Sequence, residues 1–250
     1  MAIIELKNLN KSFNNHKVLD DLNLSIEKGT TVVVIGRSGC GKSVLLKHII
    51  GVLRPNSGKV LVNGQDIWGM SRGDFNKIIF KMNMVFQGGA LFDSLTVGEN
   101  VGFELIEHGL ASGKELQKNI EEALYLVDLS GIAKLMPAEL SGGMRKRVAL
   151  ARAICMHPEI ILYDEPTTGV DPITADIINE LILSLQAKLK VTSIVVTHDM
   201  RSAYKIGNRI AMLYKGNIIA EGSSKEIQNS RDPFVHQFIN GLAKGPITEE

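Results

Sequence analysis

Short apolar runs that end at polar residues recur along this chain, with helical patterns between them. Three of them are TVVVIG (residues 31–36), EIILYDE (159–165) and TSIVVTH (192–198). Continuous apolar runs of this length are typical of buried parallel strands, and parallel sheets bind ligands at the carboxyl ends of their strands. The pattern therefore predicts an α/β fold whose functional residues follow these runs.

Shorter strand patterns accompany this core. The segments 3–9, 22–27 and 59–64 resemble antiparallel strands rather than buried parallel ones. Near the end of the chain, residues 209–222 predict a β-hairpin that turns at Lys215-Gly216-Asn217. We expect an antiparallel β flank beside the parallel core.

Residues 88–157 contain no strand-like run. Apolar side chains recur there at helical spacing, at Leu116, Ile120, Ala123, Leu124 and Val127. This pattern predicts a helical subdomain inserted into the core. The expected organisation is one domain at 1–240, comprising a core at 1–87 and 158–230 and this subdomain at 88–157.

A C-terminal tail helix is predicted over residues 231–250. Asp232 can cap such a helix, and Pro233 suits its first turn. The apolar stripe of the predicted helix consists of Phe234, Phe238, Ile239 and Leu242. Two arrangements stay open: the tail crosses to a second copy of the chain, or it folds back onto its own core.

Composition is that of an ordinary globular protein, with 44% apolar and 22% charged residues among 250. The formal net charge of +1 argues against a nucleic-acid partner, and no apolar run approaches the ~18 residues that span a bilayer. The N-terminus lacks the features of a signal peptide. Cys40 and Cys155 are too few for a disulfide framework, so a reducing cytosol is expected.

The strongest motif is GRSGCGKS, residues 36–43, which matches G-x-x-x-x-G-K-[ST] between an apolar strand and a helix. The glycines let backbone N–H groups surround phosphate oxygens, and the helix N-terminus favours negative charge. We expect Lys42 to reach the β- and γ-phosphates and the Ser43 hydroxyl to bind Mg²⁺. The predicted nucleotide-binding residues here are Gly36, Arg37, Ser38, Gly39, Cys40, Gly41, Lys42, Ser43 and Val44.

Cys40 lies within this loop, where its simplest role is that of a small filler. Because helix N-termini favour the reactive thiolate, alkylation of Cys40 is nevertheless expected to block nucleotide binding. Bound nucleotide is expected to protect the thiol.

Two adjacent carboxylates end the run EIILYDE. Neighbouring side chains in a strand point to opposite faces, so Asp164 and Glu165 are expected to have different roles. Asp164 suits Mg²⁺ coordination, and Glu165 is expected to polarise the attacking water. Gln87, after MNMVF, and His198, after IVVT, also follow strand patterns, so both are expected at the same sheet edge.

The segment LSGGMRKR, residues 140–147, resembles a second phosphate site, with a hydroxyl, two glycines and a basic helix. Its basic residues Arg145, Lys146 and Arg147 are interpreted as a solvated helix face and not as a nucleic-acid site. A chain that already has one phosphate loop needs a reason for another.

Together these motifs resemble the nucleotide-binding subunits of ABC transporters. GRSGCGKS, FQ at Gln87, LSGGM, IILYDEP, TGVD and THD occur in the order and spacing of that family, and the resemblance covers essentially the whole chain. It implies a P-loop NTPase (RecA-like) core with an antiparallel β flank and an inserted α-helical subdomain. It also implies ATP as the nucleotide, Mg²⁺ as the cofactor and ATP hydrolysis as the activity.

The same resemblance assigns roles to single residues. Phe13 would stack on adenine, Gln87 would bind Mg²⁺ and sense the transporter, and His198 would hold the γ-phosphate. The catalytic set is then Lys42, Gln87, Glu165 and His198, and the Mg²⁺ set is Ser43, Gln87 and Asp164.

The resemblance also explains the second phosphate-like segment. Ser141, Gly142 and Gly143 of one copy would cap the ATP that the phosphate loop of another copy holds, and Asp171 would bridge the two copies. The chain is therefore expected to form a homodimer around two ATP molecules.

Softer motifs resemble the ATPases of bacterial phospholipid-transport systems of the Mla (MCE-associated) type. They are FQGGALFDSLTVGENVGFEL, KLMPAELSGGMRKRVALARAI, DEPTTGVDPI and FVHQFINGLAKGPI. Met144, where most of the ABC family has Gln, fits this branch. The resemblance implies a permease partner, an MCE-type lipid-binding protein in the complex and a peripheral position on the cytoplasmic side of the inner membrane.

Four apolar residues after Gln87 have two open interpretations: Leu91, Phe92, Leu95 and Val97. They are expected either to contact a cytoplasmic helix of the permease or to form part of the core of the helical subdomain. Exposure of such a cluster in the isolated chain would favour the first interpretation.

Three other functions are considered. An ATPase of a small-solute importer, for example for amino acids, would use the same motor motifs. A soluble ABC ATPase that acts on DNA or ribosomes usually has two cassettes or a long coiled-coil insertion, and this sequence has neither. A small-molecule kinase or GTPase would leave LSGGM unexplained, and the sequence has no N-K-x-D-like motif for reading a base.

Overall fold

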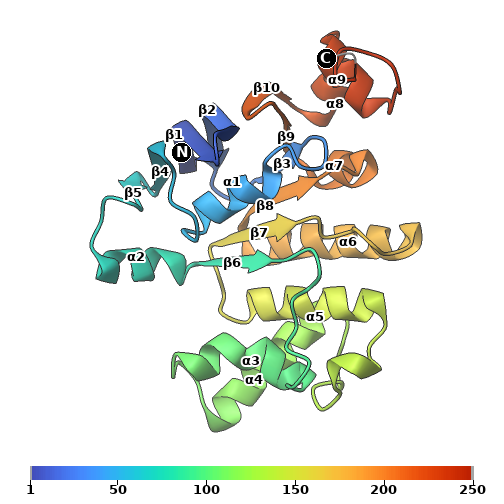
Figure 1. The fold of residues 1–250 in the computed structure, drawn as a ribbon. Helices are drawn as coiled ribbons and strands as arrows, with labels where there is room; N and C mark the ends of the chain where they lie inside the picture. Colours follow the sequence, from blue (N-terminus) through green and yellow to red (C-terminus); the bar gives the residue numbers. More distant parts are fainter. Residues whose placement is uncertain (1, 249–250) are drawn as a thin grey trace. The chain divides into compact units, whose positions relative to one another are not determined.

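The computed structural model of the chain describes residues 2–248 and divides into two compact units. The first unit runs to Ile79 and resumes at Thr192, and the second is Phe80–Val191. Figure 1 shows the succession of helices and strands. The predicted boundaries of the helical subdomain, at residues 88 and 157, stay a prediction. Across residues 2–248, no helix has both the length and the apolar character to cross a membrane.

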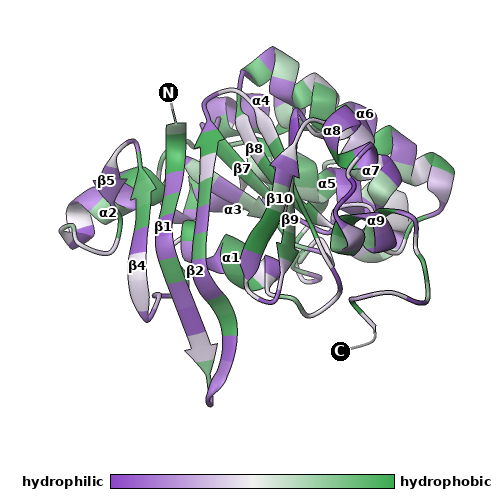
Figure 2. Cartoon of the chain, turned by 90° about the horizontal axis from the view of Figure 1, so that it is seen from above, coloured by the Kyte–Doolittle hydropathy of each residue, from purple (hydrophilic) through white to green (hydrophobic). Residues whose placement is uncertain are grey.

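A four-stranded antiparallel sheet in the first unit forms the predicted β flank. Its order is β2-β1-β4-β5, with β1 at Ala2–Phe13, β2 at His16–Glu27, β4 at Ser57–Val62 and β5 at Gln65–Asp66. Apolar and polar segments alternate along β1 and β2 in Figure 2. The apolar positions Ile4, Leu6 and Leu22 are buried, so one face of this sheet contributes to the core of the unit.

The hairpin of β1 and β2 is longer than the segments 3–9 and 22–27 predict. Its turn is formed by Asn14 and Asn15, whose φ angles of 44° and 66° are those of a tight hairpin turn. Asn8 and Asp21 also have left-handed φ angles of 49°, and Asn8 Nδ2 donates to Asp21 Oδ1 at 2.8 Å. These bulges interrupt the alternation of apolar and polar residues along the two strands. The polar contact between Asn8 and Asp21 joins β1 and β2 at this point, so their pairing continues beyond the apolar segments.

The apolar runs at 31–36 and 192–198 form β3 (Thr31–Ile35) and β8 (Thr192–Thr197), which pair in parallel as predicted. On its other side, β3 pairs in parallel with β9 (Arg209–Tyr214), and β9 pairs with the antiparallel β10 (Asn217–Gly222). Lys215 and Gly216 have φ angles of 44° and 83°, so the predicted hairpin is confirmed. The helices of this unit are α1 (Lys42–Ile49), α2 (Arg72–Ile79), α7 (Met200–Ile206), α8 (Ser224–Gln228) and α9 (Pro233–Ile239).

The predicted tail helix begins as expected but is shorter. Asp232 caps α9 by accepting from the amides of Phe234 and Val235 at 2.9 and 3.0 Å. The helix ends at Ile239, so Leu242 lies beyond it and is 46% exposed. The buried apolar residue of α9 is Val235, which the predicted stripe did not include.

The tail folds back onto its own unit, which is one of the two arrangements left open by the sequence. Buried Gln237 accepts a hydrogen bond from the Ile247 amide at 2.7 Å and donates to the Leu242 carbonyl at 3.1 Å. Arg37 Nη1 donates to the Ile247 carbonyl at 3.3 Å. The buried Gln237 amide therefore holds the tail against α9, and Arg37 joins the tail to the segment that contains the predicted phosphate loop.

Replacing Gln237 with Ala is expected to release this tail. The substitution removes hydrogen bonds that are each worth about 1 kcal/mol. The released tail can then enter the active site of trypsin, which cleaves the bond after the exposed residue Lys244. Cleavage at this bond, followed by mass spectrometry, should be several-fold faster than in the parent chain. Replacing the exposed neighbour His236 with Ala is the control. Equal cleavage rates in the Gln237→Ala and parent proteins would contradict the role of Gln237.

The second unit contains the parallel strands β6 (Met82–Val85) and β7 (Ile160–Asp164). Its helices are α3 (Val97–Glu107), α4 (Gly113–Leu126), the 3₁₀ helix η1 (Pro137–Glu139), α5 (Gly142–Ile154) and α6 (Pro172–Leu189). Every element assigned within residues 88–157 is helical, which confirms the helical pattern. α4 packs tightly on α3, since a Cβ on Gly102 would lie 2.8 Å from Ile120 Cδ1.

Candidate functional site

The glycine-rich loop of residues 36–43 connects buried β3 to α1. Gly39 and Gly41 have φ angles of 81° and 107°, which glycine adopts without strain. α1 begins at Lys42, and the glycine before it provides no side-chain oxygen to cap the first amides of the helix. The loop therefore presents backbone N–H groups at a helix N-terminus, which suits an anionic phosphate.

The side chain of Lys42 lies inside this loop and is 6% exposed. Its Nζ donates to the carbonyl oxygens of Gly36 at 2.7 Å and Arg37 at 3.1 Å. A Cβ on Gly36 would lie 2.5 Å from the Leu213 carbonyl oxygen, so a side chain at this position would displace the loop. An ammonium group, helix amides and the Ser43 hydroxyl form a donor set that fits a nucleoside triphosphate with Mg²⁺.

His198 belongs to the same unit as the loop. It is exposed and directly follows β8, whose last residue Thr197 pairs with Ile35 of β3. Because the two strands are parallel, His198 and Gly36 leave the sheet at the same edge. His198 thus follows a parallel strand, as predicted, and its contact with a phosphate stays a prediction.

Phe13 ends β1, and its ring is 43% exposed. Lys11 Nζ lies 5.2 Å from the centre of this ring. The next strand of the hairpin contacts the phosphate loop, since a Cβ on Gly41 would approach Val18 Cγ1 to 3.1 Å. An exposed ring on a hairpin that packs on the loop suits the predicted stacking on a nucleobase.

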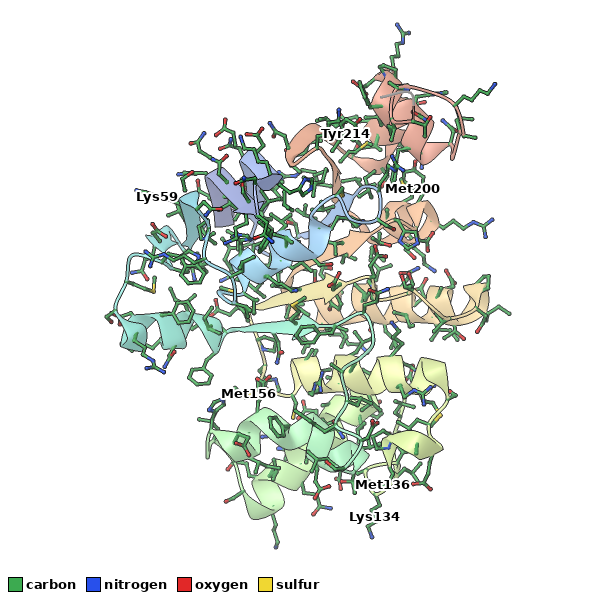
Figure 3. All side chains as sticks on the ribbon, in the orientation of Figure 1. Lys59, Lys134, Met136, Met156, Met200 and Tyr214 are labelled. Atoms are coloured by element: carbon green, nitrogen blue, oxygen red, sulfur yellow. The ribbon has the colours of Figure 1, made fainter. Side chains whose placement is uncertain are left out.

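The two cysteines differ in accessibility. Cys40 is half-buried and, with Arg37, lines a hollow of about 390 Å³ to which Tyr214 (labelled in Figure 3) also contributes. Cys155 is buried in the second unit, and burial, with a smaller effect of Glu104, raises the pKa of its thiol to about 12. Only Cys40 is therefore expected to react with an alkylating reagent near neutral pH.

Alkylation with N-ethylmaleimide is expected to modify Cys40 and to abolish ATP binding, because the added group fills the phosphate loop. Mass spectrometry should show one modified thiol, and saturating ATP should slow the reaction. A Cys40→Ser variant should keep ATP binding after the same treatment. Modification of Cys40 at the same rate with and without ATP would contradict the assignment of the loop.

In the second unit, Asp164 and Glu165 are 8% and 9% exposed. β7 ends at Asp164, and Glu165 follows with a left-handed φ of 49°. The alternation of strand side chains thus does not apply to Glu165, whose direction is set by this turn; that part of the sequence argument is wrong. Thr168 Oγ1 donates to Glu165 Oε2 at 3.1 Å and orients the carboxylate. Such a backbone conformation costs on the order of 1 kcal/mol and is often found at active sites.

Gln87 leaves the parallel pair of β6 and β7 at the same edge as Asp164, since Val85 pairs with Tyr163. The backbone carbonyl of Gln87 accepts a hydrogen bond from Lys146 Nζ of α5. This contact lies within the second unit and joins the helix after the signature segment to the loop after β6.

The interpretation of Arg145, Lys146 and Arg147 as a solvated face is wrong for Lys146, which is 9% exposed. Burial lowers the pKa of Lys146, and the negative charge of Glu165 acts in the opposite direction. The helical pattern contained a sign of this burial, because the apolar residues Ala149 and Leu150 follow Lys146 at the spacing of one helix face. Arg145, by contrast, is exposed.

The signature segment LSGGM forms the start of α5, which begins at Gly142. The Ser141 hydroxyl caps the helix by accepting from the Met144 amide at 3.2 Å. A Cβ on Gly143 would lie 2.7 Å from Thr174 Cγ2, so only glycine allows α5 to pack so closely on α6. Both Ser141 and Gly142 are exposed, which leaves them accessible to a ligand or a second chain.

Asp171 lies beside this segment and caps α6. Its carboxylate accepts from the Thr174 hydroxyl at 2.6 Å and from the amides of Ile173 and Thr174 at 3.0 Å, and these bonds lower its pKa. A hollow of about 410 Å³ is lined by Ser141, Gly142, Gly143, Met144, Arg147, Gly169, Val170, Asp171, Thr174, Ile177 and Ile178. The structure thus brings together the four residues predicted to face a partner copy, although their roles stay a prediction.

Comparisons with known proteins agree with these motifs. The family model described as "ABC transporter" matches residues 19–168. The chain is 41% identical to the "Intermembrane phospholipid transport system ATP-binding protein MlaF" of Haemophilus influenzae, over 98% of this chain and 93% of that protein. It is 40% identical to the "Probable ribonucleotide transport ATP-binding protein mkl" of Mycobacterium leprae, over 98% of this chain and 70% of that protein.

A solved structure extends the comparison. The post-hydrolysis dimer of the ATP-binding cassette MJ0796 bound to ADP and Pi has a TM-score of 0.80 and 35% identity, over 88% of this chain and 98% of that chain. The predicted P-loop NTPase fold is thereby confirmed. The chain belongs to the ABC transporter family and is one of its ATP-hydrolysing cassettes.

Proposed function

We propose that this chain is the ATP-hydrolysing subunit of a transporter that moves phospholipid between the membranes of a bacterial envelope. The observation that supports this most strongly is the 41% identity to MlaF, which extends over 98% of this chain and 93% of that protein. Two copies would dimerise on ATP beneath a permease, on the cytoplasmic side of the inner membrane, and an MCE-type lipid-binding protein would complete the complex.

In this proposal the first unit binds the nucleotide. The amides of residues 36–43 and Lys42 hold the phosphates, Phe13 stacks on adenine, and His198 contacts the γ-phosphate. Ser43, Gln87 and Asp164 would hold Mg²⁺, which would supply positive charge to the phosphate oxygens. The exposed ring of Phe13 and the loop amides at the start of α1 support these assignments.

Hydrolysis depends on Glu165, which accepts a proton from the water that attacks the γ-phosphate. Its left-handed backbone and the hydrogen bond from Thr168 restrict the carboxylate to one direction, as a general base requires. The P–O bond to the β-phosphate breaks, and ADP and phosphate leave.

The second copy completes each site. Ser141, Gly142 and Gly143 at the exposed start of α5 would close over the nucleotide of the partner, and Asp171 would contact the partner across the interface. The hollow that these residues line supports a shared surface, and the cassette MJ0796 is a relative whose solved structure is a dimer.

Purification of the tagged chain from membranes of its own host tests the proposal. A co-purifying permease together with an MCE-type protein, and ATPase activity that responds to phospholipid vesicles, are the expected results. A co-purifying binding protein for amino acids, or a complex without an MCE-type protein, would overturn the phospholipid assignment.

One observation favours a second candidate. The identity of 40% to mkl, named as a probable ribonucleotide transport protein, would suit a soluble nucleotide as cargo. The same preparation distinguishes the two cargoes. Stimulation of its ATPase activity by ribonucleotides other than ATP, and not by phospholipid, would support the second candidate.

A further inference from the structure

Two cationic side chains of α5 bind the backbone of the loop that follows Gln87. Lys146 donates to the Gln87 carbonyl. Further along the same helix, Arg152 donates to the carbonyls of Gly89 at 2.8 Å and Ala90 at 2.7 Å. Gly89 and Ala90 both have left-handed φ angles, of 78° and 46°, so these contacts hold a loop conformation that is costly for a residue with a side chain.

The other side of the same loop is held by α3. Buried Asn100 accepts from the Phe92 amide at 2.8 Å, and its Nδ2 donates to the carbonyls of Phe92 and Leu95 at 3.0 Å. The loop of residues 87–95 is therefore fixed between two helices, and α5 is the helix that also carries the signature segment. Ser141 precedes Lys146 by five residues, which is ~7 Å along a rigid helix.

Burial of Lys146 is difficult to explain by stability. A buried ammonium group loses hydration, and an apolar residue of similar volume at such a position is often as stable or more stable. Gln87 itself is exposed, so water could satisfy its carbonyl if Lys146 were absent. The negative charge of Glu165 raises the pKa of Lys146, but burial has the larger effect and lowers it.

We infer that Lys146 is a positioning residue for ATP hydrolysis, which ties the Gln87 loop to the signature helix. The inference rests on the proposed role of Gln87. Through Lys146, Gln87, which acts on a subunit's own nucleotide, moves together with Ser141, which acts on the nucleotide of the partner. A displacement of the loop by a permease is thereby passed to both sites.

The test compares Lys146→Met, Lys146→Arg and the control Arg145→Met in the full-length protein. Met keeps the length of the lysine stem but removes the donor and the charge, Arg keeps both, and Arg145 is an exposed neighbour on the same helix. In the Met variant, kcat for ATP is expected to fall on the order of tenfold, because small displacements of catalytic groups reduce rate strongly. KM for ATP should change little, the Arg variant should recover most of kcat, and Arg145→Met should behave as the parent.

Hydrogen exchange without nucleotide provides a readout that does not depend on activity. The amides of Gly89 and Phe92 should exchange faster in Lys146→Met than in the parent, and their exchange in Arg145→Met should match the parent. The melting temperatures of both variants should also match that of the parent. Unchanged exchange, or faster exchange with unchanged kcat, would overturn the inference. A parent protein that binds but never hydrolyses ATP would instead contradict the proposed function, and the exchange result would still report on the contact itself.

Discussion

Replacement of Glu165 with Gln is expected to reduce ATP hydrolysis by about 10²- to 10⁴-fold, the usual contribution of a general base. ATP binding should persist, because the amides of residues 36–43 and Lys42 are unchanged. Since Gln has almost the same shape as Glu, the hydrogen bond from Thr168 and the left-handed backbone are retained. Binding without turnover should hold two copies closed around two ATP molecules, which size-exclusion chromatography with and without ATP measures.

Glu159→Gln is a matched control at the other end of β7. Glu159 pairs with Lys81 at 2.8 Å on the surface, so the same change of charge there should leave hydrolysis and oligomeric state as in the parent. If Glu165→Gln remained monomeric with bound ATP, the predicted role of the signature segment in closing a partner's site would be wrong. If it retained the hydrolysis rate of the parent, Glu165 would not be the base.

The sequence predicts well those parts of the fold that depend on a single local property, such as the burial of a whole strand or a left-handed φ angle. The runs that became β3, β7 and β8 have apolar centres because these strands are buried throughout, and hydropathy identifies them. The phosphate loop follows the same logic, since its glycines are needed wherever the backbone takes a left-handed φ. The lengths of β1 and β2 were underestimated because Asn8 and Asp21 continue the hairpin through polar contacts.

The candidate site also contains residues that the sequence predicts and residues whose contacts it does not predict. Exposed Ser141 and buried Asp164 and Glu165 belong to motifs, and each lies at an end of a helix or strand. The helical pattern contains a sign that Lys146 is buried, but its hydrogen-bond partner is a carbonyl 59 residues away in the chain, and no local pattern contains such a contact. The left-handed turn at Glu165 is likewise imposed by tertiary packing, since glutamate has no intrinsic preference for it.

A substitution of Lys42 is also expected to have a large effect on ATP binding, because its ammonium group lies at the centre of the phosphate loop. Its bonds to the carbonyls of Gly36 and Arg37 hold the ammonium group against the backbone of the loop. In the complex with ATP, charged phosphate oxygens would accept hydrogen bonds from Lys42 in place of a carbonyl oxygen. Hydrogen bonds to charged groups are worth about 1.5–3 kcal/mol. The binding energy of the nucleotide therefore depends on this residue more than on any single loop amide.

Replacement of Lys42 with Ala is accordingly expected to weaken ATP binding by roughly 10- to 100-fold. Titration with a fluorescent ATP analogue measures the Kd, and hydrolysis should fall in parallel. Lys47→Ala is the matched control, since Lys47 is an exposed lysine on the same helix α1. Combination with Glu165→Gln distinguishes the two effects: the double variant should lose the ATP-dependent dimer that the single Glu165→Gln variant forms. An unchanged Kd in Lys42→Ala would mean that the loop amides alone hold the phosphates, and the assignment of Lys42 would be wrong.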